Sequence, residues 1–344
     1  MLPDDLDAQL VKASAQALRY TPGKLACFSE WSKQVQARLR ELLRADLWPT
    51  SALKISVLSR EDGDGFMREK IDFSGHPLFS GSAYVLVPNH RKGRVPGVLC
   101  LHGHGGYFAG KDMVAGVTGT HPIALECAAA LNYGYGVQLA RAGYVTLCPD
   151  AYNFGERLFE KHRWSKEHIC SEYFANLMLY GYSSMGITVG TNILLLDYLL
   201  TRPEVLPDQA GCAGLSYGAV QTLFTAAVDD RIQASVVSGG LHSMGELVAA
   251  GGSICPAQML PGLLEWFDLD DVAISIAPRP ALYELMKQDS CFDFESSRRI
   301  WQKISGVYGA LMAADRTCLD APDTDHRYSG AHVPAFLKLH LGLR

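Results

Sequence analysis

Two different rhythms of apolar and polar residues run along the chain. Between residues 54 and 88, the stretches KISVLSR, MREKIDF and AYVLVP alternate apolar with polar side chains, and Gly and Asp clusters such as EDGDG punctuate them. A period of two is typical of strands with one buried face. This region is therefore predicted to form antiparallel strands.

Further along, the apolar runs become continuous and segments of helical length separate them. The runs are GVLCLH (97–102), YVTLCP (144–149), AGCAGLS (210–216), ASVVSG (234–239), PALYELM (280–286) and TCLDAP (317–322). Strands that are apolar on both faces indicate a parallel sheet covered by helices on both sides. We predict an α/β fold with a mostly parallel central sheet of about eight strands.

The N-terminal residues follow a helical spacing instead. Trp31, Val35 and Leu39 recur at four-residue steps, as on one face of a helix. We assign residues 1–50 to a helical extension that forms a cap or a dimer surface, and residues 51–344 to an α/β domain.

One connection between predicted strands is unusually long. It runs from residue 239 to residue 277 and contains GELVAAGG, CPAQMLPGLLEW and DLDD. Connections of this length are usually functional. We expect this insertion to form a lid or the wall of a pocket.

Composition narrows the class of protein and its partners. The 344 residues are 48% hydrophobic and 19% charged, with a net charge of −5, which suits a globular protein with a sizeable core and disfavours nucleic acid or an anionic membrane as partner. The N-terminus is acidic, and the longest apolar stretch, 193–200, is interrupted by Asp197. The nine cysteines include no C-x-x-C pair. We expect a cytoplasmic protein with reduced thiols, for which a homo-oligomer is an open alternative to a monomer.

The stretch AGLSYG (213–218) places a serine between two glycines. It ends a predicted strand, and YGAVQTLFTAAV (217–228) follows with helical propensity. G-x-S-x-G at a strand-to-helix turn is the nucleophile elbow, in which a strained serine presents its Oγ above the sheet. The motif alone is weak evidence, but its flanks strengthen it. Ser216 is the candidate nucleophile.

A serine of this kind takes its acid and then its histidine from later loops. His326 lies in the loop after TCLDAP, whereas His332 and His340 belong to the predicted final helix, HVPAFLKLHL. A general base that reaches over the serine is better placed on a loop. His326 is therefore the candidate base.

Several aspartates compete for the role of the acid. Asp289 follows strand PALYELM by three residues, and Asp293 is its nearest rival. Asp270 and Asp271 follow the long connection, and Asp325 adjoins the histidine in sequence. We favour Asp289, because the acid should follow strand PALYELM, and an aspartate directly before the histidine is poorly placed for a side-chain bond to the imidazole. The task of the acid is to hold the tautomer and to stabilise the imidazolium.

The loop LHGHGGYFAGK (101–111) follows an early strand and is rich in glycine. On this type of fold, one oxyanion donor comes from such a loop and the other from the residue after the nucleophile. The candidate donors are the backbone N–H groups of His104 and Tyr217, with Gly105 as the alternative to His104.

The same loop raises the question of a metal or a nucleotide. His102 and His104 have the spacing of two metal ligands, but no matching third ligand is nearby and H-E-x-x-H is absent. G-H-G-G does not have the G-x-G-x-x-G spacing, and no G-K-[ST] occurs. We expect neither a metal nor an organic cofactor.

Taken together, these segments resemble the α/β-hydrolase superfamily, and within it the dienelactone-hydrolase-like and acetyl-xylan-esterase-like branch. The matching features, spread over residues 80–344, are LHGHGGY, CPDAYNFGER, GLSYG, IAPRPAL, QDSCF and DHRYSG. The resemblance implies a Ser–His–Asp esterase without a cofactor, mapping onto Ser216, His326 and Asp289. The chain departs from the pattern at Leu285-Met286 and at Asp325, and it has a serine where the dienelactone hydrolases proper have a cysteine.

For two further groups of residues, a structural role is an alternative to a role in the active site. In PDAYNFGER, we expect Asp150, Glu156 and Arg157 to hold the loop through a buried Glu–Arg or Asp–Arg pair, rather than to contact substrate. Candidate pocket residues, for each of which core packing is the alternative, are Tyr107, Trp164, Tyr173, Met259 and Trp266.

The sequence thus predicts a serine hydrolase that cleaves a carboxylic ester of a small molecule or carbohydrate. The same residues are compatible with cleavage of an amide, a thioester or a carbon–carbon bond, or with acyl transfer. A non-catalytic binding protein is the remaining alternative. The sequence does not specify the acyl and alcohol groups.

Overall fold

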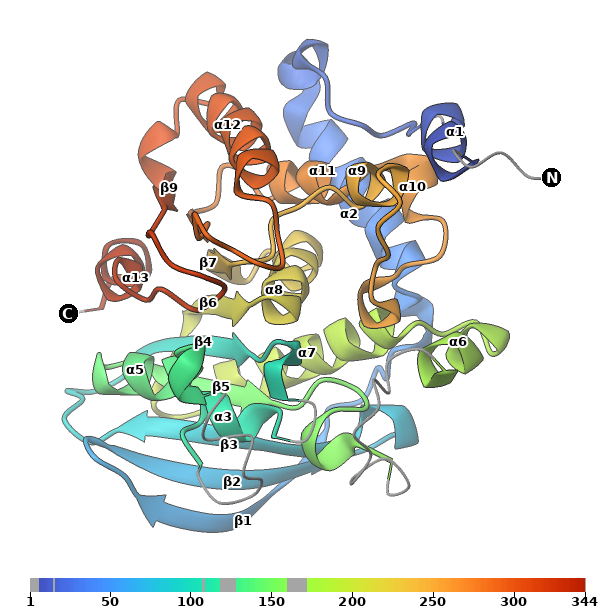
Figure 1. The fold of residues 1–344 in the computed structure, drawn as a ribbon. Coiled ribbons are helices and arrows are strands. Elements are labelled where there is room, and N and C mark those ends of the chain that lie inside the picture. Colours follow the sequence, from blue (N-terminus) through green and yellow to red (C-terminus); the bar gives the residue numbers. More distant parts are fainter. Residues whose placement is uncertain (1–5, 15, 107–108, 118–127, 160–171, 344) are drawn as a thin grey trace.

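A nine-stranded sheet runs through the middle of the molecule (Figure 1). The computed structural model describes residues 6–14, 16–106, 109–117, 128–159 and 172–343. Within them the strands lie in the order β1-β2-β3-β5-β4-β6-β7-β8-β9. The strands are β1 (Lys54–Asp62), β2 (Phe66–Ser74), β3 (Gly81–Pro88), β4 (Val95–Leu101), β5 (Val145–Pro149), β6 (Val205–Leu215), β7 (Ile232–Ser238), β8 (Ala281–Glu284) and β9 (Thr317–Asp320).

Strand direction divides the sheet as the two sequence rhythms predict. β1, β2 and β3 pair antiparallel, and β3 joins β5 antiparallel. From β5 across to β9, all neighbours are parallel. Each of the nine apolar or alternating runs overlaps one strand, so the predicted fold class is confirmed, with one strand more than the expected eight.

Helices cover both faces of this sheet. One apolar layer packs α3, α5 and α13 against the strands, and the other packs α2, α7, α8, α11 and α12. The helices are α1 (Leu6–Ala13), α2 (Phe28–Leu42), α3 (Lys111–Val114), α5 (Tyr135–Arg141), α6 (Glu172–Leu179), α7 (Ser184–Thr201), α8 (Tyr217–Val228), α9 (Met244–Ala249), α10 (Leu263–Trp266), α11 (Leu269–Ser275), α12 (Phe294–Ala310) and α13 (Val333–Leu341).

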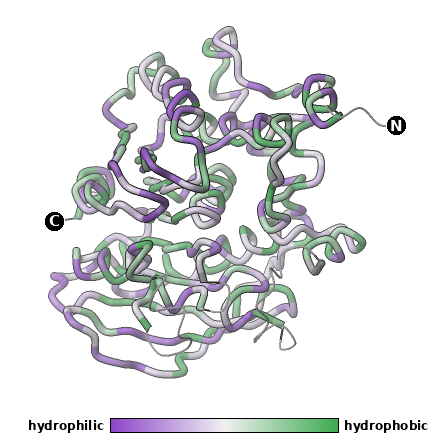
Figure 2. The backbone as a smooth tube through the Cα atoms, in the orientation of Figure 1, coloured by the Kyte–Doolittle hydropathy of each residue, from purple (hydrophilic) through white to green (hydrophobic). Residues whose placement is uncertain are grey.

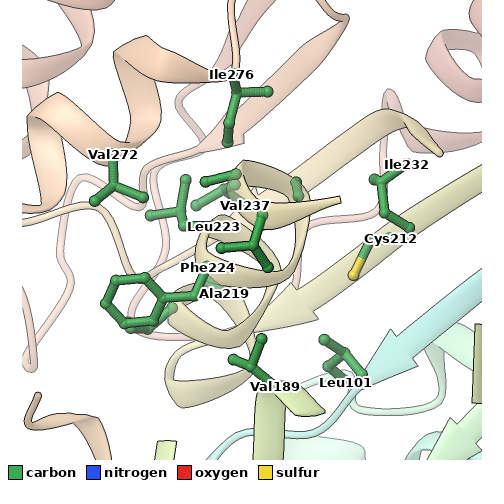
Figure 3. Packing of buried hydrophobic residues seen from close by; sticks show 14 of the residues in the cluster. Leu101, Val189, Cys212, Ala219, Leu223, Phe224, Ile232, Val237, Val272 and Ile276 are labelled. Atoms are coloured by element: carbon green, nitrogen blue, oxygen red, sulfur yellow. The ribbon is translucent and has the colours of Figure 1, made fainter. Parts of the chain in front are cut away.

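Helix α8 is the central element of the larger layer. All of its residues are buried, and Leu223 and Phe224 belong to the same packed cluster as Val272 of α11 and Val189 of α7 (Figure 3). A helix that is apolar all round needs neighbours on every side. This packing fixes the N-terminus of α8 at the carboxyl ends of the parallel strands.

Helix α7 is long and apolar enough to cross a membrane by length and composition, since its 18 residues have a mean hydropathy of 1.2. Of this window, 72% is buried inside the protein. The helix packs against β6 and α8, as the core helix of a globular domain does. Hydrophobic colour accordingly collects in the interior, while hydrophilic stretches recur along the β1–β2 edge (Figure 2).

The N-terminal helices lie against the long insertion. Trp31, Val35 and Leu39 of α2 are buried, and this helix contacts α8 and α11. The residues after α1 continue the contact, since Leu18 N donates to Trp266 O over 2.9 Å. A cavity of about 580 Å³ between α1 and the α9–α10 segment has a largely apolar lining, to which Met259 contributes. The boundary at residue 50 and the role of a lid stay predictions.

Candidate active site

Ser216 sits in a backbone conformation that few residues adopt. Its φ of 60° and ψ of −120° lie outside the regions open to ordinary L-residues. The turn is also too tight for flanking side chains. A Cβ on Gly214 would lie 2.2 Å from Gly218 O, and one on Gly218 would lie 1.9 Å from Leu101 O. The glycines at these two positions are therefore sterically required by the elbow.

The elbow is held between β6 and α8. Ser216 N donates to Ser238 O at the end of β7 over 2.8 Å, and Ser216 O accepts from Ala219 N over 2.9 Å as the helix begins. The first N–H groups of α8 consequently point toward the region of the serine, where the helix dipole favours negative charge.

His326 and Asp289 are paired by the structure. His326 Nδ1 lies 2.9 Å from Asp289 Oδ2 and 3.1 Å from Oδ1. Both side chains are largely buried, with exposures of 10% and 3%. Because a carboxylate only accepts hydrogen bonds, Nδ1 carries the hydrogen and Nε2 is left as the basic nitrogen.

The serine and the histidine flank the same short segment of chain. A Cβ on Gly239 would lie 3.0 Å from His326 Cε1, and a Cβ on Gly240 would lie 2.7 Å from Ser216 O. Both residues therefore lie at the end of β7, on the side of the sheet where the parallel strands finish. Ser216 and His326 are 110 positions apart in sequence, but both lie beside the same three residues, 238–240.

The rival aspartates have other partners. Asp293 caps α12 by accepting from Ser296 N over 2.7 Å. Asp270 lies on α11 and pairs with Lys303 Nζ at 2.6 Å. Asp271, also on α11, lies 3.6 Å from the same ammonium group. None of these three contacts involves His326.

Asp325, a rival for the role of the acid, and His332, a rival for the role of the base, also have other partners. Asp325 Oδ1 accepts from the backbone N–H of His326, over 2.6 Å, and from Ser290 N, over 2.9 Å. His332 is at the start of α13, with Nε2 3.8 Å from Asp320 Oδ1. Asp325 thus shapes the loop rather than the imidazole.

The glycine-rich loop runs directly beside the serine. A Cβ on Gly103 would lie 3.1 Å from Ser216 Cβ and 2.6 Å from Leu215 O. The ring of His104 lies 4.8 Å from that of Tyr217, centroid to centroid. The two residues named as oxyanion donors therefore belong to adjacent segments on either side of the nucleophile.

His102 is a structural residue. Its ring is buried, Nε2 accepts from Ala151 N over 2.9 Å, and Nδ1 lies 2.9 Å from Gly103 O. Burial lowers the pKa of His102, which favours the neutral ring that these two contacts require. With both nitrogens engaged, His102 is unsuited to form a metal pair with His104.

The loop after β5 is held by a different ion pair from the one predicted. Asp150 Oδ2 lies 2.7 Å from Lys111 Nζ, and both side chains are fully buried. Arg157 donates to Asp150 O and to Leu78 O instead. The expected Asp–Arg or Glu–Arg carboxylate pair is therefore wrong in its partner, since Lys111 reaches the loop from α3 and its three-donor head suits Asp150 and the nearby Glu156.

Three residues beside the site, Cys255, His242 and Phe292, were not predicted to lie there. Cys255 of the insertion places Sγ 3.0 Å from His104 Nε2. Phe292 lies between two histidine rings, 5.8 Å from His326 and 4.9 Å from His242 by ring centroids. They come from connecting segments, where no periodic pattern marks a residue.

The predicted pocket residues divide by what the structure describes. Tyr107, Trp164 and the side chain of Tyr173 lie outside the described residues. Met259 lines the cavity beside α1. Trp266 packs under the guanidinium of Arg38, whose Cζ is 3.7 Å from the ring centroid. Both therefore lie against the N-terminal helices.

Comparison with known proteins identifies the family of this chain. The model of the Abhydrolase family matches residues 14–335. The chain is 28% identical over 286 residues to "Putative hydrolase YtaP" of Bacillus subtilis (strain 168), covering 81% of this chain and 89% of that one.

Solved structures share the fold at low identity. One, described as "a putative acetyl xylan esterase" from Bacteroides fragilis NCTC 9343, has a TM-score of 0.76 at 18% identity and covers 97% of this chain and 84% of its own. A glucuronoyl esterase from Solibacter usitatus has a TM-score of 0.62 at 14% identity, covering 90% and 93%. By its sequence and its α/β-hydrolase fold, the chain belongs to the Abhydrolase family.

Proposed function

We propose that this protein hydrolyses carboxylic esters through a serine-bound acyl intermediate. One observation carries the proposal. His326, which pairs with Asp289, lies beside residues 238–240, and the strained Ser216 lies against the same segment. Strain at a residue of this type is retained when it has a functional purpose.

In the first step, Ser216 Oγ attacks the ester carbonyl while His326 Nε2 accepts its proton. The backbone N–H groups of His104 and Tyr217 are the proposed donors to the oxyanion. Asp289 stabilises the imidazolium without taking its proton. His326 then gives the proton to the departing alcohol.

In the second step, His326 Nε2 takes a proton from water, and the hydroxide attacks the acyl carbonyl. The carboxylic acid leaves, and Ser216 recovers its proton. Each donor in the oxyanion site contributes on the order of 3 kcal/mol to lowering the barrier.

We propose a carbohydrate-linked ester as the substrate class. The support is the fold shared with acetyl xylan and glucuronoyl esterases and with "Methylesterase BT1017". Their names refer to acetyl, methyl or glucuronoyl esters. Amide, thioester and carbon–carbon cleavage and acyl transfer remain competing reactions of the same residues.

The test is Ser216→Ala, with Ser59→Ala on exposed strand β1 as the control. Ser216→Ala should lower kcat on p-nitrophenyl acetate by at least ~10⁴-fold and abolish labelling by a fluorophosphonate, because the nucleophile is lost. Ser59→Ala should match the wild type. A Ser216→Ala protein that retains its folded circular dichroism and wild-type hydrolysis contradicts the proposal.

A further inference from the structure

A thiol, an imidazole and a carboxylate converge on the turn that follows β8. Single ligand atoms of Asp289, Cys291 and His326 all lie within 4.8 Å of one another. Cys291 is exposed and its thiol is free, and no step of the proposed ester hydrolysis uses its sulfur. The proposed acid and base therefore share their neighbourhood with a soft metal ligand.

We propose that this cluster binds a zinc-class divalent cation, which reversibly inhibits the enzyme by capturing His326. The binding site stands on the geometry alone, whereas the inhibition rests on the proposed function, in which His326 is the general base. The cation is here an inhibitor and has no part in the reaction.

The donor set suits this class of metal. Zinc takes cysteine sulfur at about 2.3 Å, histidine nitrogen at about 2.0 Å and carboxylate oxygen at about 2.0–2.2 Å, usually in a tetrahedron. Such bond lengths place neighbouring ligand atoms roughly 3.3–3.7 Å apart. Because the ligand atoms of this cluster lie within 4.8 Å of one another, they need to approach by at most roughly 1.1–1.5 Å to reach these separations, and water supplies the fourth position.

Asp289 and Cys291 differ in how their side chains are held. Asp289 is fixed, because its Oδ1 accepts from Cys291 N over 2.8 Å and from Phe292 N over 3.0 Å. The exposed Cys291 side chain has room to turn toward it. The carboxylate of Asp325, which accepts from Ser290 N, adds negative charge beside the site.

Coordination removes the base whichever ring nitrogen is used. A metal on Nε2 occupies the atom that accepts the serine proton. A metal on Nδ1 displaces the hydrogen bond to Asp289, and the ring hydrogen passes from Nδ1 through solvent to Nε2, which can then no longer accept the serine proton. In both cases the Cys291 thiol gives its proton to solvent as the sulfur–metal bond forms, and a chelator reverses the reaction.

The experiment compares wild type, Cys291→Ser and Cys318→Ser. Cys318 is an exposed cysteine on β9 and serves as the matched control. Two readouts are needed: the sulfur-to-metal charge-transfer absorption when Co²⁺ is added, and the Zn²⁺ concentration that halves hydrolysis of p-nitrophenyl acetate.

We expect wild type and Cys318→Ser to develop the cobalt–thiolate band and to be inhibited by Zn²⁺, with full recovery in EDTA. Cys291→Ser should keep the wild-type turnover without metal, lack the band and need at least about tenfold more Zn²⁺, because one ligand is lost.

Absence of the cobalt–thiolate band in wild type overturns the metal site, and so does a band that persists in Cys291→Ser. A band without any inhibition overturns the inhibitory role. If wild type hydrolyses no ester at all, the proposed function fails, while the cobalt band still tests the metal site independently.

Discussion

Asp289 shows how one carboxylate is divided between two tasks at the residue scale. Oδ1 closes a turn by accepting from the backbone N–H groups of Cys291 and Phe292, and Oδ2 holds His326 Nδ1 at 2.9 Å. The turn aims the carboxylate, so the imidazole has one orientation. One carboxylate can do both because its two oxygen atoms point in different directions.

Asp289→Asn separates these tasks. The amide oxygen still closes the turn, but the NH₂ group faces Nδ1 and favours the wrong histidine tautomer, so kcat should fall by ~10⁴-fold with little change in folding. Ester hydrolysis and urea unfolding measure the two effects. Asp293→Asn is the control, because asparagine still caps α12; equal losses in both variants would count against Asp289 as the acid.

Lys111 offers a second prediction about a single residue. Lys111→Met leaves Asp150 as a buried and unpaired charge, which should lower the free energy of unfolding by about 3–5 kcal/mol. Lys70→Met removes a half-exposed partner of Glu156 and should cost less than about 1 kcal/mol. Urea denaturation of both variants checks the contrast, and similar losses would show that burial is not the deciding factor.

At the scale of elements, glycines have opposite consequences according to their surroundings. Gly218 begins α8 against β4, where a Cβ would meet Leu101 O at 1.9 Å. Gly306 lies on the exposed face of α12, with nothing within 4 Å of an added Cβ. Replacement of glycine by alanine therefore tests steric packing at the start of α8 and helix propensity within α12.

Gly306→Ala should raise the free energy of unfolding by about 0.5–1 kcal/mol, because alanine loses less backbone freedom in a helix. Gly218→Ala should lower it by about 3 kcal/mol or more, because backbone atoms must move to relieve the clash. Thermal and urea unfolding measure both changes. A stabilising Gly218→Ala would show that the elbow is looser than described.

At the scale of the whole molecule, a buried carboxylate joins the end of β8 to the loop that carries His326. Glu284 accepts from Gly330 N over 2.8 Å and from Ser329 N over 3.1 Å. Burial raises the pKa of Glu284 to about 7, and burial together with Asp270 raises that of Asp271 to about 6. Both groups hold a proton more tightly in the folded protein than in the unfolded chain.

The sign of the pH dependence follows. Between the unfolded pKa of Glu284, 4.5, and its folded value of about 7, the native state binds more protons, so stability falls as pH rises. Glu284 alone contributes a loss on the order of 3 kcal/mol by pH 7. Glu284→Gln should flatten this decline in urea unfolding measured from pH 4.5 to 7.5, whereas Glu30→Gln on the exposed side of α2 should not.

Part of the candidate site could be predicted from the sequence. G-x-S-x-G could be recognised because a turn this tight leaves no room for side chains on either side of the serine. His326 and Asp289 could be named because strands come in order and each ends in a loop at the same edge. The packing of Cys255, His242 and Phe292 beside the site could not be predicted, because nothing in a connecting segment encodes which loop it will meet. Lys111 was missed as the partner of Asp150 because α3 reaches that loop only through the packing of the sheet.

The sequence by itself determined the strands, the elbow and the family, because these depend on local periodicity and on steric requirements within a few residues. The sequence favoured Asp289 among several aspartates, but only the tertiary structure excluded its rivals and decided which cation neutralises Asp150 and which thiol lies beside the acid and the base. Those pairings join segments 35 to 40 residues apart, and their distances are fixed by how helices and loops pack around the sheet. Contacts of this kind are selected by the free energy of the whole fold, which no short stretch of sequence contains.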